Sequence, residues 1–157
     1  MDYIVQFVAS FIATACFGTI FNVPPKTYFH CGLVGALGWI IYYALTQQGL
    51  DVVEASFFGA FVIAIVAHTY ARRFKMPMLI FSVAGIIPLV PGGMAYNSMR
   101  NVVEDDYIQG LQYGMKAFLI TGAIVIGLVF AEVLVQLVFR AMHASKKKIQ
   151  MVKKNKS

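Results

Sequence analysis

Five long apolar runs dominate the sequence and restrict the folds open to it. They are Tyr3–Phe21, Tyr28–Thr46, Val53–Tyr70, Met78–Val90 and Ala117–Phe139. Four of the runs approach the ~20 residues that a helix needs to cross ~30 Å of hydrocarbon, whereas the fourth is too short to cross alone. Continuous runs without two-residue alternation argue against a β-barrel. The sequence therefore predicts an all-α polytopic membrane protein with five transmembrane helices, the fourth broken at a Pro/Gly element.

The composition supports the same fold class. Apolar residues make up 59% of the chain and charged residues 13%, against about 25% charged residues in an average soluble domain. A soluble fold could not bury so much apolar surface, so lipid has to cover it. We expect residues 1–142 to form a single transmembrane domain and residues 143–157, which hold six lysines, to form a basic cytoplasmic tail.

The distribution of charge predicts an orientation. With five crossings, one side of the membrane receives Lys26, the Arg72–Lys75 cluster, Arg140 and the lysines of the tail. The other side receives only Arg100 and Lys116 as basic residues. Basic residues concentrate in cytoplasmic loops. We therefore expect a multi-pass protein of the cell (inner) membrane with its N-terminus outside and its C-terminus in the cytoplasm.

The fourth run ends in a sequence that a regular helix cannot accommodate. Pro88 and Pro91 each lack a backbone donor, and Gly92 and Gly93 permit close backbone approaches. Non-helical backbone at membrane depth persists only where protein buries it or where it lines a wet cavity. A new helix starting near Gly93 or Met94 would direct free amides and a positive dipole end toward a carboxylate. The alternative is a kinked helix whose glycines only ease helix packing.

The predicted helix after this break carries polar residues at three- and four-residue spacing. They are Asn97, Arg100, Asn101 and Glu104, with Tyr96 beside them. On this physical reasoning Gly93, Asn97, Arg100 and Asn101 are candidates for substrate binding, and Glu104 is a candidate for ion coupling. The alternative is a stripe that faces external water.

Glu132 is an isolated acid in the last apolar run. It lies roughly 10 Å inside the hydrocarbon, where a lipid-exposed carboxyl costs about 2.5–3.5 kcal/mol. We expect it to be protonated, paired or turned toward a wet interior. It is a candidate for proton coupling; the alternative is an interhelical hydrogen bond or a pair with Arg140.

Three glycines recur at three-residue intervals in the second run. Gly32, Gly35 and Gly38 lie near one helical face and allow another backbone to approach closely. They are predicted helix-packing residues, either within one chain or against another subunit.

Two segments resemble the threonine/serine exporter family, in particular its small-subunit type, in which a larger and a smaller membrane protein share one transporter. The segments are Phe21–Pro24 continuing into Cys31–Gly38, and Val83–Gly92 followed by Tyr96. The resemblance carries over Pro88, Pro91, Gly92 and Tyr96 as a shared element of the substrate-binding region. It implies ion-driven export of threonine and serine, or of dicarboxylates such as succinate.

The resemblance also implies partners. A larger membrane subunit of the same family, or further copies of this chain in a homo-oligomer, would supply the remaining half of the transporter. The alternative function is a structural or assembly subunit that does not transport. No Ser/His/Asp set, metal-ligand spacing or phosphate loop occurs in the sequence, so we expect neither an enzyme nor a cofactor, metal or nucleic-acid partner.

Overall fold

The chain folds into helices joined by short connections. This computed structural model describes the backbone of residues 2–154 and the side chains of residues 2–139. Two short 3-10 helices, η1 and η2, interrupt the α-helices. The elements in chain order are α1 (Asp2–Ile20), η1 (Pro25–Thr27), α2 (Tyr28–Gln47), α3 (Val52–Phe74), α4 (Met78–Ile86), η2 (Ile87–Leu89), α5 (Gly92–Val103) and α6 (Tyr107–Lys154).

The helices have the dimensions of membrane spans. Four of them are long and apolar enough to cross a bilayer: α1, α2 with η1, α3, and the Tyr107–Phe139 part of α6. A fifth candidate span combines Met78–Leu89 with α5, and its two halves meet at an angle of 49°. The predicted fold class is therefore confirmed, including the broken fourth span.

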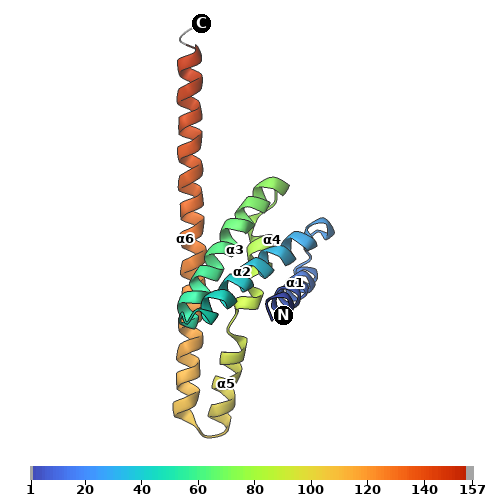
Figure 1. The fold of residues 1–157 in the computed structure, drawn as a ribbon, viewed down its shortest axis with the longest axis vertical. Helices are drawn as coiled ribbons and strands as arrows, with labels where there is room; N and C mark the ends of the chain where they lie inside the picture. Colours follow the sequence, from blue (N-terminus) through green and yellow to red (C-terminus); the bar gives the residue numbers. More distant parts are fainter. Residues whose placement is uncertain (1, 155–157) are drawn as a thin grey trace.

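Helices α1 to α4 form a packed bundle, and α6 lies along its α3 side (Figure 1). Helix α3 contacts α2, α4 and α6, so it is the central helix of the bundle. Its buried face consists mostly of small residues, which let neighbouring helices approach closely. Those residues are Ala55, Ser56, Gly59, Ala60, Ile63, Ala64, Ala67 and Ala71.

The three glycines of α2 lie against two different helices. A Cβ atom added at Gly32 would overlap the Phe11 ring on α1, and one added at Gly35 would overlap Thr14 on α1. A Cβ at Gly38 would overlap Ile63 on α3. The glycines therefore permit close contacts of α2 with its own neighbours inside this chain.

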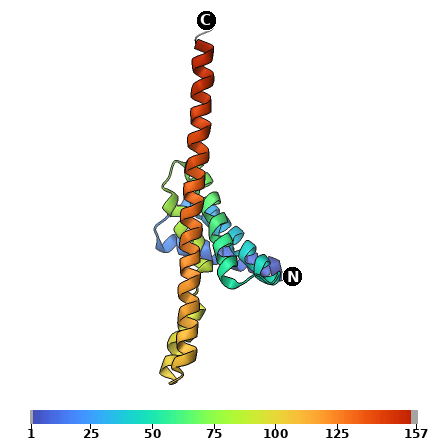
Figure 2. The same cartoon turned by 90° about the vertical axis from the view of Figure 1, so that its left-hand side faces the viewer.

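The segment between the fourth and fifth apolar runs, residues 91–116, is largely helical. Helix α5 occupies its first part, and α6 already begins at Tyr107, ten residues before the fifth apolar run. Residues 107–116 contain no proline, so nothing stops the last helix from extending toward its N-terminus. Figures 1 and 2 show α5 and the first part of α6 side by side, projecting beyond the α1–α4 bundle.

The C-terminal part of α6 continues as one helix through Lys154. The predicted basic tail, residues 143–157, and the proposed pairing partner Arg140 have side chains outside the described residues.

Candidate substrate site at the helix break

The break between α4 and α5 opens beside a cavity. Pro88 lies in η2, Val90 adopts an extended conformation, and Pro91 precedes the first residue of α5. The Gly92 amide donates to the Val90 carbonyl (2.8 Å) and the Ala95 amide to the Pro91 carbonyl (3.1 Å). The amides of Gly93 and Met94 belong to the first turn of α5, where no preceding helical carbonyl can accept from them.

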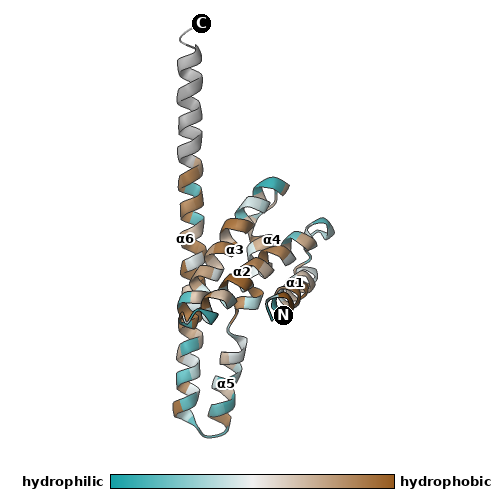
Figure 3. Cartoon of the chain, viewed as in Figure 1, coloured by the Kyte–Doolittle hydropathy of each residue, from teal (hydrophilic) through white to brown (hydrophobic). Residues whose placement is uncertain are grey.

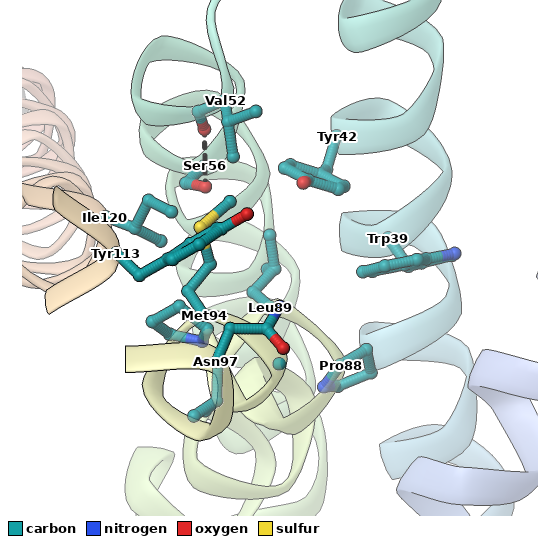
Figure 4. A pocket seen from close by; sticks show the side chains of 13 residues that line it. Trp39, Tyr42, Val52, Ser56, Pro88, Leu89, Met94, Asn97, Tyr113 and Ile120 are labelled. Carbon is teal, nitrogen blue, oxygen red and sulfur yellow. Dashed lines mark hydrogen bonds between the residues drawn. The ribbon is translucent and has the colours of Figure 1, made fainter. Parts of the chain in front are cut away.

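The cavity has a volume of about 300 Å³ and lies between the break and three other helices (Figure 4). This volume is at the lower end of the range for small-molecule sites. Helix α2 contributes two aromatic side chains, α3 contributes Ser56, and α6 contributes Tyr113 opposite them. The full lining is Trp39, Tyr42, Val52, Ser56, Pro88, Leu89, Val90, Pro91, Gly93, Met94, Asn97, Tyr113 and Ile120.

The two aromatic side chains of α2, Trp39 and Tyr42, are positioned by a hydrogen bond to α1 and by their mutual ring contact. The indole Nε1 of Trp39 donates to Oε1 of Gln6 on α1 (2.8 Å), and the Trp39 and Tyr42 ring centroids are 5.0 Å apart. The Ser56 hydroxyl donates to the Val52 carbonyl (2.7 Å), so its oxygen can still accept a hydrogen bond.

Three polar groups of the lining are available for a ligand. The Asn97 side-chain amide and the Tyr42 and Tyr113 hydroxyls form no hydrogen bond with any residue that the structure describes. Gly93 and Met94 of the first turn of α5 line the same cavity. Apolar walls with a few convergent polar groups are typical of a site for a small polar metabolite.

The structure separates the predicted substrate-binding residues into two groups. Pro88, Pro91, Gly93 and Asn97 line the cavity. Gly92 lies in the same break but outside the lining, and the Asn101 side chain donates to the Asn97 carbonyl (2.7 Å).

The second group lies on another side of α5. Tyr96, Arg100 and Glu104 surround a separate shallow depression. Nε of Arg100 donates to Oε1 of Glu104 (2.8 Å), and both side chains are more than half exposed. Arg100, predicted to bind substrate, and Glu104, predicted to couple an ion, therefore pair with each other, and neither lines the cavity.

Glu132 lies on the exposed surface of α6, near the contact with α3. Its Oε1 accepts a hydrogen bond from Nε2 of Gln136 at 3.4 Å. Within α3, Nε of Arg72 donates to Nε2 of His68 (3.1 Å), and across the α3–α6 contact the Arg72 guanidinium lies 3.1 Å from the centre of the Phe139 ring. This cluster lies toward the opposite end of α3 from the cavity at the break.

Nine of the thirteen lining residues were not predicted from the sequence as site residues, and four of these nine carry a polar group: Trp39, Tyr42, Ser56 and Tyr113. Trp39 and Tyr42 lie toward one end of a span, where aromatic residues usually mark the membrane interface. The proline-free stretch before Ala117 could have indicated that Tyr113 is helical and can face the break.

A bundle of four or five apolar helices long enough to cross a bilayer, one of them broken beside a cavity, is the architecture of a multi-pass membrane protein. The sequence matches the profile of the family "Threonine/Serine exporter, ThrE" over residues 6–134. The chain belongs to this exporter family.

The sequence is also similar to part of a longer protein. The sequence is 32% identical over 120 residues to an uncharacterized protein of Haemophilus influenzae. The alignment covers 71% of this chain but 40% of that relative, so the chain spans about two fifths of its length. No solved structure matches the sequence.

Proposed function

We propose that this chain is a subunit of a secondary-active exporter of small carboxylate-bearing metabolites, threonine and serine or dicarboxylates such as succinate. The observation that carries the proposal is the cavity at the break, which is lined by Gly93 and Met94 of the first turn of α5 and by Asn97 one turn further on. Family membership supports export as the activity. The substrate moves against its gradient at the expense of an ion gradient.

The substrate carboxylate binds at the N-terminus of α5. The amides of Gly93 and Met94 donate to it, and the positive end of the helix dipole stabilises its charge. Asn97 and the Tyr42 and Tyr113 hydroxyls bind the remaining polar groups of the substrate, and Trp39 shields it. The Arg100–Glu104 pair and Glu132 lie away from this cavity, so they do not touch the substrate here; Glu132 is the candidate for ion coupling.

A larger subunit of the same family, or another copy of this chain, completes the transporter. Support comes from the longer relative, of which this chain covers 40%. The outer face of α6 provides the contact surface, because apolar side chains there are exposed away from the α3 contact, among them Phe118, Ile126 and Val129. Gly32, Gly35 and Gly38 contact helices of this chain instead, which weakens the case for a purely structural subunit built on these glycines.

The orientation follows the distribution of charge. The α1–α2 connection with Lys26, and the C-terminal end of α3 with Arg72, Arg73 and the following Lys75, lie toward the end of the bundle to which α6 extends its C-terminal part (Figure 1). The positive-inside rule assigns this end to the cytoplasm. The α5–α6 pair then faces the outside.

The test measures export from cells loaded with a threonine-containing dipeptide, whose hydrolysis raises internal threonine. Cells lacking the chain should retain threonine, and the wild-type chain with its partner should restore efflux. Asn97→Leu should reduce efflux about tenfold, because one buried hydrogen bond to a charged or polar ligand contributes about 1.5 kcal/mol. Gln112→Leu, a matched change on the exposed surface of α6, should have no effect.

Unchanged threonine, serine and succinate efflux in the deletion strain, with the partner expressed at its normal level, would exclude the proposed substrates. Equal losses from Asn97→Leu and Gln112→Leu would show that the cavity at the break is not the substrate site. A chain that purifies with no membrane partner and as a monomer would contradict the subunit assignment.

A further inference from the structure

A second cavity lies toward the other end of α3, away from the helix break. Its volume is about 460 Å³. The first cavity touches α3 at Val52 and Ser56, whereas the second covers the two turns that end at Arg73. The lining consists of His30 from the first turn of α2 and Ile65, Val66, Thr69, Tyr70 and Arg73 from α3.

The lining changes from apolar to basic along α3. Ile65 and Val66 form the end nearer the middle of the helix, and Arg73 lies eight residues further, about 12 Å along the axis. Figure 3 shows the same change in α3, from an apolar central part to a hydrophilic C-terminal end. Ile65 is 37% exposed, so the apolar end opens to the outside of the bundle, where the bilayer lies. An occupant with one charged end and one apolar end matches this lining.

Two polar groups of the cavity lack partners. The guanidinium of Arg73 forms no ion pair or hydrogen bond with any described residue. Nδ1 of His30 is buried and has no hydrogen-bond partner within the described part of the chain. The His30 ring is fixed by edge contacts with Tyr70 and Phe74, at centroid distances of 5.0 and 4.5 Å.

The neighbouring Arg72, unlike Arg73, has interaction partners among the described residues. Arg72 donates to His68 and lies over the Phe139 ring, on the side of α3 that faces α6. Arg73 points to the α2 side and is available for an external anion. The sequence contains no acidic residue in 20–30 or 62–80, the segments that surround the cavity, so the local charge is positive. A phosphate group is a suitable ligand for an unpaired guanidinium.

We propose that this cavity binds one anionic phospholipid. Its phosphate accepts hydrogen bonds from Arg73 and from His30, and an acyl chain extends along Ile65 and Val66 toward the middle of the membrane. The site is separate from the proposed substrate cavity, and the inference does not depend on the identity of the substrate.

The test measures lipid binding by native mass spectrometry of the purified, delipidated full chain titrated with phosphatidylglycerol. Wild type should bind one lipid more tightly than the background of weak sites. Arg73→Ala should weaken this binding about tenfold, because a charge-assisted hydrogen bond is lost. Arg72→Ala, which removes the same charge from the adjacent residue, should leave the affinity unchanged because its guanidinium is already engaged.

Two further measurements distinguish a phospholipid ligand from a soluble anion. Glycerol 3-phosphate, which carries a phosphate but no acyl chain, should not displace the lipid at equal concentration. Ile65→Asn should weaken lipid binding severalfold, because it places a polar amide beside the acyl chain. Circular dichroism of each variant confirms that it is folded before the comparison is made.

Three outcomes would overturn the proposal. Equal losses from Arg73→Ala and Arg72→Ala would indicate a nonspecific charge effect. Effective competition by glycerol 3-phosphate would indicate a soluble-anion site. An unchanged affinity in folded Ile65→Asn would place the acyl chain elsewhere.

Discussion

Helices α4 and α5 are the two halves of one bent span, but their surroundings differ. Four of the nine residues of α4 are buried, and it contacts α1, α2 and α3. None of the twelve residues of α5, all of them described, is buried, and its main contact is with α6. The first half is fixed within the bundle, and the second half carries Asn97, whose side chain lines the cavity.

The sequences of the two halves explain this difference. Helix α4 consists of apolar and small residues, and Gly85 lets it lie directly against Val34 of α2 and Ile63 of α3. Helix α5 contains two asparagines and an arginine, and its first two glycines have no atom within 4 Å of an added Cβ. The backbone is therefore tightly packed at Gly85 before the break and unobstructed at Gly92 and Gly93 after it, so substitutions at these glycines should have different effects.

The largest expected effect is on stability, from Gly85→Leu in α4. The new side chain would overlap Val34 and Ile63, and overpacking of this kind costs about 1–3 kcal/mol or more. We expect a Tm lower by several degrees and poor expression, measured by thermal unfolding in detergent. Gly122→Leu on α6 is the control, since no atom lies within 4 Å of a Cβ there. Equal Tm values for the two variants would contradict the tight position of α4.

The second prediction concerns transport without loss of folding. Gly93→Leu should preserve the Tm but abolish efflux, because the side chain would enter a cavity of about 300 Å³ and crowd the amides of the first turn. Gly92→Leu, one residue earlier and outside the lining, should retain most efflux. Efflux from dipeptide-loaded cells and thermal unfolding of the purified chains measure the two properties separately. If Gly92→Leu and Gly93→Leu reduce efflux equally, transport depends on the backbone conformation or packing of the break and not on the space in the cavity.

The smallest effect is expected at the α5–α6 contact. The Ser98 hydroxyl donates to the Gly110 carbonyl on α6 (2.7 Å), and such a bond contributes about 1 kcal/mol. Ser98→Ala should therefore increase amide hydrogen exchange in α5 about fivefold. Thr121→Ala removes a hydroxyl bond made within α6 itself (2.9 Å) and should leave α5 unchanged. Unaltered exchange in α5 of Ser98→Ala would mean that other contacts hold this helix.

The sequence predicts the helix break more accurately than it predicts the site. Proline and glycine act through the local backbone, so Pro91-Gly92-Gly93 indicated where one helix ends and the next begins, and α5 does start at Gly92. The apolar runs likewise predicted the spans, because their length is set by the bilayer.

The rotation of α5 about its axis could not be predicted in this way. Spacing shows that Asn97 and Arg100 lie near one face of a helix, but the neighbour that each meets depends on tertiary packing. Contacts of Ser98 and Val102 with Gly110 of α6 turn Asn97 toward the cavity and leave Arg100 beside Glu104. Trp39 and Tyr113 enter the lining from helices distant in sequence, and local periodicity carries no information on such contacts.

The uninterrupted length of α6 has a mechanical consequence. Its 48 residues form a rod of about 72 Å, more than twice the ~30 Å hydrocarbon thickness. A tilt of about 10° around its midpoint would displace each end by about 6 Å in opposite directions. Helix α5 packs against α6 near one end of this rod, and α3 packs against it near the middle. A rigid rotation of α6 about its contact with α3 would therefore move its end beside α5. A small rotation there would change the space beside Tyr113 without any change of secondary structure.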